Sequence, residues 1–151
     1  MRLLLFLLDE TRFAIRADAV NEIVRAVAVT PLPNAPAVIL GIIDLRGSIV
    51  PVFDLRRRFG MPAKDVDLPD HFIIARSARR VAALHVDRVL DLADVDDASV
   101  APIDNAPRVR HHLAGVATLP DGMALIHDLD AFLSAAEADS LDSALAASSG
   151  A

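Results

Sequence analysis

Short apolar runs, separated by turn residues at regular spacing, are the feature that most constrains the fold of this chain. The run Leu3–Leu8 is followed by a polar turn and then by residues 12–17, in which the large apolar Phe13 and Ile15 alternate with smaller or charged neighbours. Alternation with a period of two is typical of a half-buried β-strand. Similar runs recur as far as residue 92, and Gly, Pro and Asp separate them. The pattern predicts a mainly β protein, built as barrels or as a sandwich.

Two segments are predicted not to form strands. Asp18 can accept from the free amides of a first helical turn, so residues 19–25 (AVNEIVR) are expected to form a short helix. Residues 134–151 are rich in Ala and Ser and contain few large apolar side chains. A solvated tail, helical or disordered, is therefore expected there.

A short internal repeat suggests two similar lobes. Gly41–Leu45 aligns without gaps on Gly115–Leu119, and Asp54-Leu55 then falls on Asp128-Leu129. Each copy has the pattern strand, tight turn, strand. Because so short a match also arises by chance, duplication and coincidence both stay open.

Composition excludes several classes of function. The 151 residues suit one domain with a real core, and the net charge of −6 disfavours a binder of nucleic acid or of an anionic membrane. Without cysteine there is no disulfide and no thiolate site. The apolar run Leu3–Leu8 is shorter than the roughly 7–15 residues of a secretory signal or the about 20 of a membrane span. We therefore expect a cytoplasmic protein with no segment inserted in a membrane.

Familiar catalytic motifs are missing from the sequence, which has no glycine-rich phosphate loop, no G-x-S-x-G and no His-Glu-x-x-His. It predicts no catalytic residue, no metal site and no cofactor. Asp44 and Asp54 leave open a small hydrolase with a general acid/base pair. The run Arg56–Phe59 (RRRF) is interpreted as a solvated strand end rather than as a nucleic-acid contact. No spacing typical of a metal site links the five histidines, His71, His85, His111, His112 and His127.

One arginine, Arg46, interrupts the apolar first copy of the repeat. A two-residue loop at Gly47–Ser48 fits the sequence, but Pro51 conflicts with its register and favours a four-residue loop at Arg46–Ile49. Either loop exposes Arg46 at the turn. A surface charge paired with Asp44 and an anchor on an apolar docking surface both stay open from the residues alone.

The segment ILGIIDLRGSIVPVFDLRRRFG (residues 39–60) resembles the hallmark of CheW-like proteins, the chemotaxis coupling family. In that family a Gly and apolar residues precede Asn-Leu-Arg-Gly, and an apolar strand with Pro then ends in Asp-Leu. VNEIV at 20–24 and AGVATLPDGMALIHDLDAFL at 114–133 extend the resemblance over residues 1–133. The chain departs from the pattern in two places, because Asp44 replaces the usual Asn and His127 occupies a normally apolar or neutral site.

The resemblance implies both a fold and a function. The fold would be two packed SH3-like five-stranded β-barrel lobes with short helices, over residues 1–133, followed by a tail at 134–151. The protein would be a non-catalytic adaptor between the cytoplasmic tips of chemoreceptors (methyl-accepting proteins) and the regulatory domain of a chemotaxis histidine kinase, recruited to membrane-associated receptor arrays. Its kinase-facing residues are not bound to a motif and stay unassigned. Its receptor-facing residues would be Val20, Glu22, Leu45, Arg46 and Gly47.

Within that set, Glu22 is the expected partner of Arg46, and Asp44 is expected to compete for the same guanidinium. Three other functions stay open beside this one. A CheW-like scaffold could serve a non-flagellar chemosensory pathway, such as surface motility. A small hydrolase would use Asp44 or Asp54, and an OB-like nucleic-acid binder would be retained on DNA or RNA in a salt-dependent way.

Overall fold

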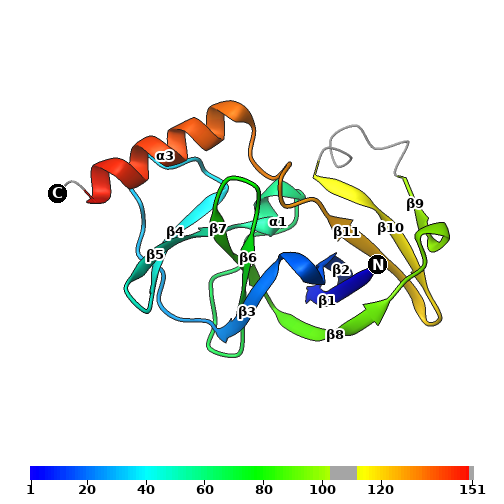
Figure 1. Ribbon diagram of the computed structural model, residues 1–151. Coiled ribbons are helices and arrows are strands. Elements are labelled where there is room, and N and C mark those ends of the chain that lie inside the picture. Colours follow the sequence, from blue (N-terminus) through cyan, green and yellow to red (C-terminus); the bar gives the residue numbers. More distant parts are fainter. Residues whose placement is uncertain (103–111, 150–151) are drawn as a thin grey trace.

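A computed structural model gives the structure of residues 1–102 and 112–149 (Figure 1). Strands dominate it, which confirms the predicted mainly β fold. Its helical elements are η1 (Ala17–Ala19), α1 (Leu55–Arg58), η2 (Asp97–Ser99) and α3 (Ala135–Ser149). Its strands are β1 (Arg2–Leu8), β2 (Thr11–Arg16), β3 (Val20–Arg25), β4 (Ile39–Leu45), β5 (Ser48–Phe53), β6 (His71–Arg76), β7 (Val81–Val86), β8 (Arg88–Asp94), β9 (Val100–Ala101), β10 (Leu113–Leu119) and β11 (Gly122–His127).

The strands form two sheets that share one plan. One sheet has the order β8-β1-β2-β11-β10-β9 and the other the order β3-β6-β7-β5-β4. Each contains one parallel pair, β2 with β11 and β7 with β5, flanked by antiparallel hairpins. These are the two SH3-like lobes that the family resemblance implies, although neither sheet closes fully into a barrel and one carries a sixth, short strand.

The chain crosses between the lobes and returns. β1 and β2 pair with β8–β11, so one lobe is assembled from both ends of the chain, and we call it the split lobe. Strands β3–β7 are consecutive in sequence and form the other lobe, which we call the continuous lobe. Figure 1 shows the two side by side, with α3 running along the continuous lobe.

The repeated hairpins occupy equivalent places in the two lobes. Each has a register shift just before its glycine, at Gly41 in β4 and at Gly115 in β10. A Cβ on Gly41 would lie 2.2 Å from the carbonyl oxygen of Thr30, and one on Gly115 would lie 2.8 Å from that of Ala101. Both glycines therefore let a neighbouring backbone approach closely, which explains why the repeat begins with Gly in each copy.

The first apolar run is buried on both faces. Leu4, Phe6 and Leu8 point into a core cluster shared by the two lobes, whereas Leu3 and Leu5 point into the interior of the split lobe. A strand covered on both sides has no polar face, so its sequence is continuously apolar. The expectation of a buried strand in this segment is confirmed.

The expected helix at residues 19–25 is wrong. The chain makes a single 3-10 turn, η1, and then enters β3, which pairs with β6 from Val20 to Arg25. Asp18 lies inside η1, whose N-cap is Arg16, and its carboxylate accepts from the Arg16 side chain at 3.3 Å. Burial alternates along β3 with a period of two, so pairing with a neighbouring strand decided the local structure over the capping signal.

The expectation of a solvated tail is wrong for residues 135–149, which form helix α3 docked on the lobes. Leu141 is fully buried and joins the core cluster shared by the lobes. The helix begins with a capping box, because the Glu137 N–H donates to Ser134 Oγ and the Ser134 N–H donates to Glu137 Oε1. The letters SAAE at 134–137 carry that signal in the sequence.

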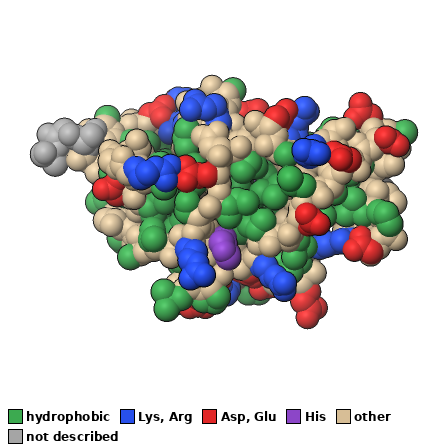
Figure 2. Space-filling model, turned by 60° about the horizontal axis from the view of Figure 1, so that its bottom comes forward, with side chains coloured by type: hydrophobic (Ala, Val, Ile, Leu, Met, Phe, Trp, Pro, Cys, Tyr) green, Lys and Arg blue, Asp and Glu red, His purple; other side chains and the backbone are tan. Residues whose placement is uncertain are grey.

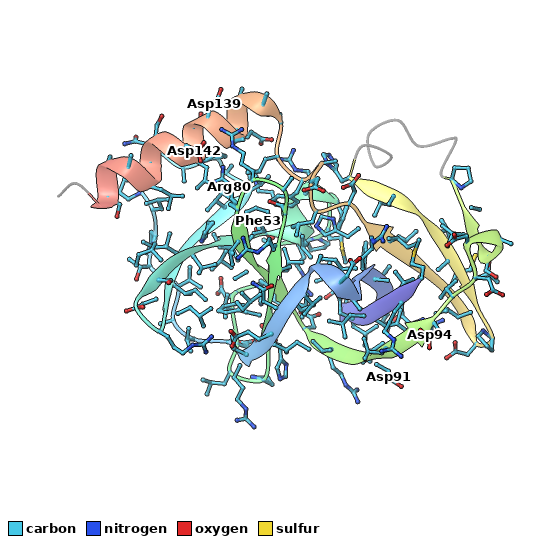
Figure 3. The ribbon with its side chains drawn as sticks, viewed as in Figure 1. Phe53, Arg80, Asp91, Asp94, Asp139 and Asp142 are labelled. Carbon is cyan, nitrogen blue, oxygen red and sulfur yellow. The ribbon has the colours of Figure 1, made fainter. Side chains whose placement is uncertain are left out.

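Basic residues of the β6–β7 turn pair with acidic residues of α3. Arg80 donates to Asp142 Oδ1 at 2.6 Å, and Arg79 bridges Asp142 and Asp139. Figure 3 shows Arg80 pointing from this turn towards the two aspartates, with Phe53 lying below it. The helix is therefore fixed both by an apolar contact and by ion pairs with the continuous lobe.

Candidate functional site

The β4–β5 hairpin closes with a two-residue loop, Arg46–Gly47. Leu45 pairs with Ser48, and both loop residues have positive φ, 50° at Arg46 and 88° at Gly47. Positive φ at both central positions defines the type I′ turn that matches the twist of a hairpin. Both predicted loops, Gly47–Ser48 and Arg46–Ile49, are therefore wrong, because each pairs the residues of β4 and β5 differently from the observed register. Arg46 does lie exposed at the turn, as expected.

Pro51 fits the observed register without losing a hydrogen bond to β4. It lies opposite Ile42, whose N–H and C=O both bond to Thr30 on the other side of β4. Residue pairs alternate along an antiparallel ladder, and this pair is one that exchanges no hydrogen bond. Pro51 therefore does not conflict with a two-residue loop, and the four-residue loop is not needed.

Asp44 shapes the turn rather than pairing with Arg46. The Gly47 N–H donates to Asp44 Oδ1 at 2.8 Å, so the carboxylate takes the acceptor role that an asparagine would also fill. Asp54 caps α1 by accepting from the Arg57 N–H at 3.2 Å. Asp44 lies on β4 opposite Ile49, and Asp54 follows β5 five residues beyond Ile49. At 3.3 Å per residue the two carboxylates are about 16 Å apart, too far to share a proton. A carboxylate pair for hydrolysis is therefore not formed.

Arg46 instead forms a two-pronged ion pair with Glu22. Its Nη1 donates to Glu22 Oε1 at 3.0 Å, and its Nη2 donates to Glu22 Oε2. The hydrogen bond from Arg46 holds the pKa of the Glu22 carboxyl below its usual value. Glu22 is on β3 and Arg46 follows β4, and these are the two edge strands of the continuous lobe. The pair thus joins the two edges of the curled sheet.

The five residues expected to face a receptor do not share a single surface. Leu45 packs on the interior of the continuous lobe, and Gly47 completes the turn. Val20 is separated from Glu22 by a register shift in β3 and lines a different feature, a groove between the lobes. The structure therefore brings Glu22, Arg46 and Gly47 together and places Val20 on the adjoining groove.

This inter-lobe groove has a volume of about 640 Å³. Two of its apolar residues are notably exposed, Ile23 at 41% and Leu92 at 50%. Figure 2 shows hydrophobic side chains across the middle of the face at the bottom of Figure 1, with charged side chains around them. Asp91 and Asp94 project from β8 on this side of the molecule (Figure 3). The residues that line the inter-lobe groove are Arg2, Leu4, Ala17, Asp18, Val20, Ile23, Val89, Leu90, Asp91 and Leu92.

The contribution of β8 to this groove was not predicted from the sequence. A signal was present, because Val89, Leu90 and Leu92 crowd large apolar residues into a strand that begins and ends with charge. Burial along β8 confirms that these side chains are only partly covered or exposed. An apolar strand that cannot bury its side chains marks a place where another molecule can cover them.

The RRRF run is not solvated at two of its three arginines. The Arg56 side chain is 2% exposed and pairs with Asp9 and Asp87. Arg58 donates to both carboxylate oxygens of Glu137 at 2.6 and 2.7 Å and lies over the ring of Phe132. These side chains hold elements together and are not available as a basic surface for nucleic acid.

Two histidines are buried in different ways. His85 Nε2 lies 2.8 Å from Asp70 Oδ2, in a pair that Lys64 also joins. His127 has no hydrogen-bond partner among the described residues, and its burial lowers its pKa to about 4. Among the residues that the structure describes, no group of His, Asp and Glu has the arrangement of a metal site. His111 lies outside those residues.

The chain is similar to known proteins over nearly its whole length. The model of the CheW-like domain matches residues 2–137. "Chemotaxis protein CheW" of Rhizobium meliloti (strain 1021) is 33% identical over 130 residues, which are 85% of this chain and 84% of that protein. "Protein FrzA" of Myxococcus xanthus is 29% identical over 112 residues, 74% of this chain and 70% of its own.

A solved structure agrees with these matches. The crystal structure of scaffolding protein TtCheW from Thermoanaerobacter tengcongensis superposes with a TM-score of 0.81 at 30% identity, covering 90% of this chain and 89% of that one. Within residues 1–102 and 112–149, no helix has the length and apolar character needed to cross a membrane. The matched domain and the shared two-lobed fold agree, and the chain belongs to the CheW-like domain family.

Proposed function

We propose that this protein is a non-catalytic adaptor that couples the cytoplasmic tips of chemoreceptors to the regulatory domain of a chemotaxis histidine kinase. Its relatives carry the names chemotaxis protein CheW and scaffolding protein TtCheW, which supports this role. The adaptor unit would comprise residues 1–133, with α3 docked on it. It would work in the cytoplasm, recruited to receptor arrays at the membrane.

The observation that carries the proposal is the placement of Arg46. A non-glycine residue at positive φ is strained, and type I′ turns favour Asn or Gly there. The equivalent hairpin of the split lobe closes with Pro120-Asp121, so the fold does not require arginine at this turn. An exposed arginine kept in a strained position is well explained by a binding role.

The neighbouring groove suits one helix of a receptor bundle. Val20 and Ile23 on one wall, with Val89 and Leu92 on the other, provide an apolar lining for the apolar face of a helix. Polar residues of that helix would then reach the Arg46–Glu22 pair on the adjoining edge. Arginine at the margin of an apolar contact is common among residues that dominate binding energy. We propose that Val20, Glu22 and Arg46 contact the receptor, with Leu45 and Gly47 shaping the turn.

Charge reversal at Arg46 tests the proposal. Arg46→Glu should leave the fold intact, because an exposed pair contributes at most about 1 kcal/mol to folding. If Arg46 anchors a receptor, binding to a cytoplasmic tip fragment of a chemoreceptor from the same cell should weaken by roughly 2–5 kcal/mol, about thirtyfold or more. Calorimetric titration beside thermal unfolding measures both quantities.

The matched control is Arg12→Glu. Arg12 pairs with Asp121 at the tip of the equivalent hairpin in the split lobe, so its reversal changes the same charge away from the groove. Unchanged affinity of Arg46→Glu would refute the docking role, and loss of its fold would make Arg46 architectural. Co-purification of the kinase and receptor distinguishes flagellar chemotaxis from another chemosensory pathway, such as one for surface motility.

A further inference from the structure

Arg56 links three parts of the chain at the junction of the lobes. It lies in α1, directly after β5, the first strand of the parallel pair in the continuous lobe. Its Nη2 donates to Asp9 Oδ1 at 2.9 Å, in the β1–β2 turn of the split lobe. The same nitrogen donates to Asp87 Oδ2, in the step between β7 and β8 where the chain crosses from one lobe to the other. We call Arg56, Asp9 and Asp87 the Arg56 cluster.

The cluster fixes the backbone as well as the side chains. Asp87 Oδ2 also accepts from the Asp9 N–H at 2.7 Å, and Asp9 is held at a φ of 53°. The Asp87 N–H donates to the carbonyl of Leu7. One carboxylate therefore ties the first hairpin of the split lobe, the crossing segment and α1 to one another.

The contacts of Arg56 are poorly suited to a purely stabilising role. Its Nε and Nη1 are buried without a partner among the described residues. A buried ion pair with unpaired donors contributes little net stability, because desolvation offsets the attraction. What such a pair does supply is a defined geometry between the groups that it joins. At 2% exposure the side chain also cannot touch a partner protein.

The crossing segment leads directly into the inter-lobe groove. Val89 and Leu92 on one wall follow Asp87 within β8, and Val20 and Ile23 form the opposite wall on β3 of the continuous lobe. The position of β8 relative to β3 sets the width of the groove. We propose that Arg56 is a positioning residue that sets how the two lobes meet, and through them the shape of the groove that takes the receptor helix.

The consequence for receptor binding rests on the proposed function, but the positioning claim is tested without a receptor. The chain has no cysteine, so Ile49→Cys in the continuous lobe and Met123→Cys in the split lobe accept two spin labels. Ile49 lies on β5 and is 54% exposed, and Met123 lies on β11 and is 66% exposed. Double electron–electron resonance then gives the distance distribution between the lobes. We expect Arg56→Met to shift or broaden that distribution in protein that remains folded.

The control variant is Arg12→Met. It removes an arginine from an Arg–Asp pair that lies within one lobe, and it should leave the distribution as it is in the parent protein. A distribution unchanged by Arg56→Met would overturn the proposal, whatever happens to the melting temperature. If Arg56→Met fails to fold, Asp9→Asn replaces it, because that carboxylate is half exposed and its loss leaves Asp87 paired. A broader distribution is again expected, and an unchanged one overturns the proposal.

Affinity for the chemoreceptor tip fragment is the second measurement. Residues that act through packed neighbours alter binding roughly two- to thirtyfold, and we expect Arg56→Met to weaken it within that range. If the parent protein does not bind the fragment, the proposed function fails while the distance measurement still decides the positioning claim. If the parent binds and Arg56→Met changes the distance but not the affinity, the link from lobes to groove is refuted.

Discussion

His127 places an imidazole in the apolar core without a hydrogen-bond partner among the described residues. It lies at the end of β11, between the rings of Phe59 and Phe132. Burial penalises the charged ring and lowers its pKa from 6.5 to about 4. A neutral ring is therefore part of the native structure at physiological pH.

The pH dependence of stability follows from this depressed pKa. Between pH 6.5 and about 4 the unfolded chain binds a proton at this residue and the native protein does not. The free energy of unfolding should thus fall as pH drops through that window, by up to roughly 1.4 kcal/mol per pH unit from this residue. Urea unfolding at several pH values measures the slope.

His127→Leu should flatten the slope between pH 6.5 and about 4. Burial raises the pKa of the Asp70 carboxyl, but hydrogen bonds, first the one from Lys64, lower it to about 2. Carboxylates of this kind therefore affect stability only at lower pH. Equal slopes for the parent protein and His127→Leu would show that the ring is protonated inside the fold.

Asp44 offers a second test at the residue scale. Its carboxylate accepts from the Gly47 N–H, and an asparagine oxygen can do the same. Asp44→Asn should change the free energy of unfolding by less than about 0.5 kcal/mol, while Asp44→Ala should cost about 1 kcal/mol. Denaturant unfolding of the two variants separates them. An Asn variant as unstable as the Ala variant would mean that the charge, and not the acceptor, holds the turn.

Helix α3 shows how few apolar side chains are needed to dock an element. It presents mostly Ala and Ser, but Leu141 is fully buried and Ala138 and Ala144 are nearly so. Small residues let the helix approach closely, and Leu141, with the partly buried Leu145, then fills the remaining space. Its ion pairs with Arg79 are exposed, where solvent screens them, whereas those with Arg58 and Arg80 are largely covered.

Truncating the buried leucine should therefore destabilise the whole protein. Leu141→Ala is expected to cost about 2–4 kcal/mol, through lost burial and the cavity left behind. For a domain of this size the melting temperature falls by about 5–15 °C. The control is Ser143→Ala, two residues further along α3 at an exposed position, and it should change the melting temperature little. A Leu141 variant as stable as the control would mean that α3 does not contribute to the core.

What the sequence could predict differs from element to element. The hairpin β1–β2 follows from alternation and a polar turn, both local signals. The helix expected around Val20 failed because the pairing of β3 with β6 lies far along the chain and overrides the cap at Asp18. The loop at Arg46 was misplaced because the bonds from Ile42 to Thr30 cannot be read from neighbouring residues.

The candidate site depends even more on distant residues. Glu22 and Arg46 were expected to pair from the family resemblance, and their spacing alone gives no such contact. The β8 wall of the groove comes from the other lobe and was missed altogether. Arg56 was interpreted as solvated because a run of three arginines is usually exposed, and only the packing of α1 against two turns buries it.

At the scale of the whole molecule, the two lobes share one core. The largest apolar cluster takes Phe6 and Phe13 from the split lobe, Phe53 and Ile73 from the continuous lobe, and Leu141 from α3. Neither lobe can expose its share of this cluster without large cost, because each buried side chain contributes about 1.5–3 kcal/mol. The lobes should therefore not unfold independently.

A single cooperative transition is expected in calorimetry, with equal calorimetric and van't Hoff enthalpies. Fluorophores attached through Ile49→Cys and Met123→Cys, one in each lobe, should report the same midpoint in urea. Two separated midpoints would contradict a shared core and would make the lobes distinct folding units. The Leu141→Ala variant should lower the midpoint while keeping one transition.

The split lobe also sets an order of events during synthesis. Arg12 and Asp121, which meet across that lobe, are separated by 109 residues in the chain. As a ribosome extends the polypeptide from its N-terminus, β1 and β2 emerge first but must wait for β10 and β11, whereas β3–β7 can pair as soon as they appear. Closing so long a loop is slow, since its entropy must be lost before contacts are gained. The strands of the continuous lobe would therefore pair first, but the core shared by the two lobes would close only when β10 and β11 arrive. Until then the apolar β1–β2 hairpin would be the part most in need of protection.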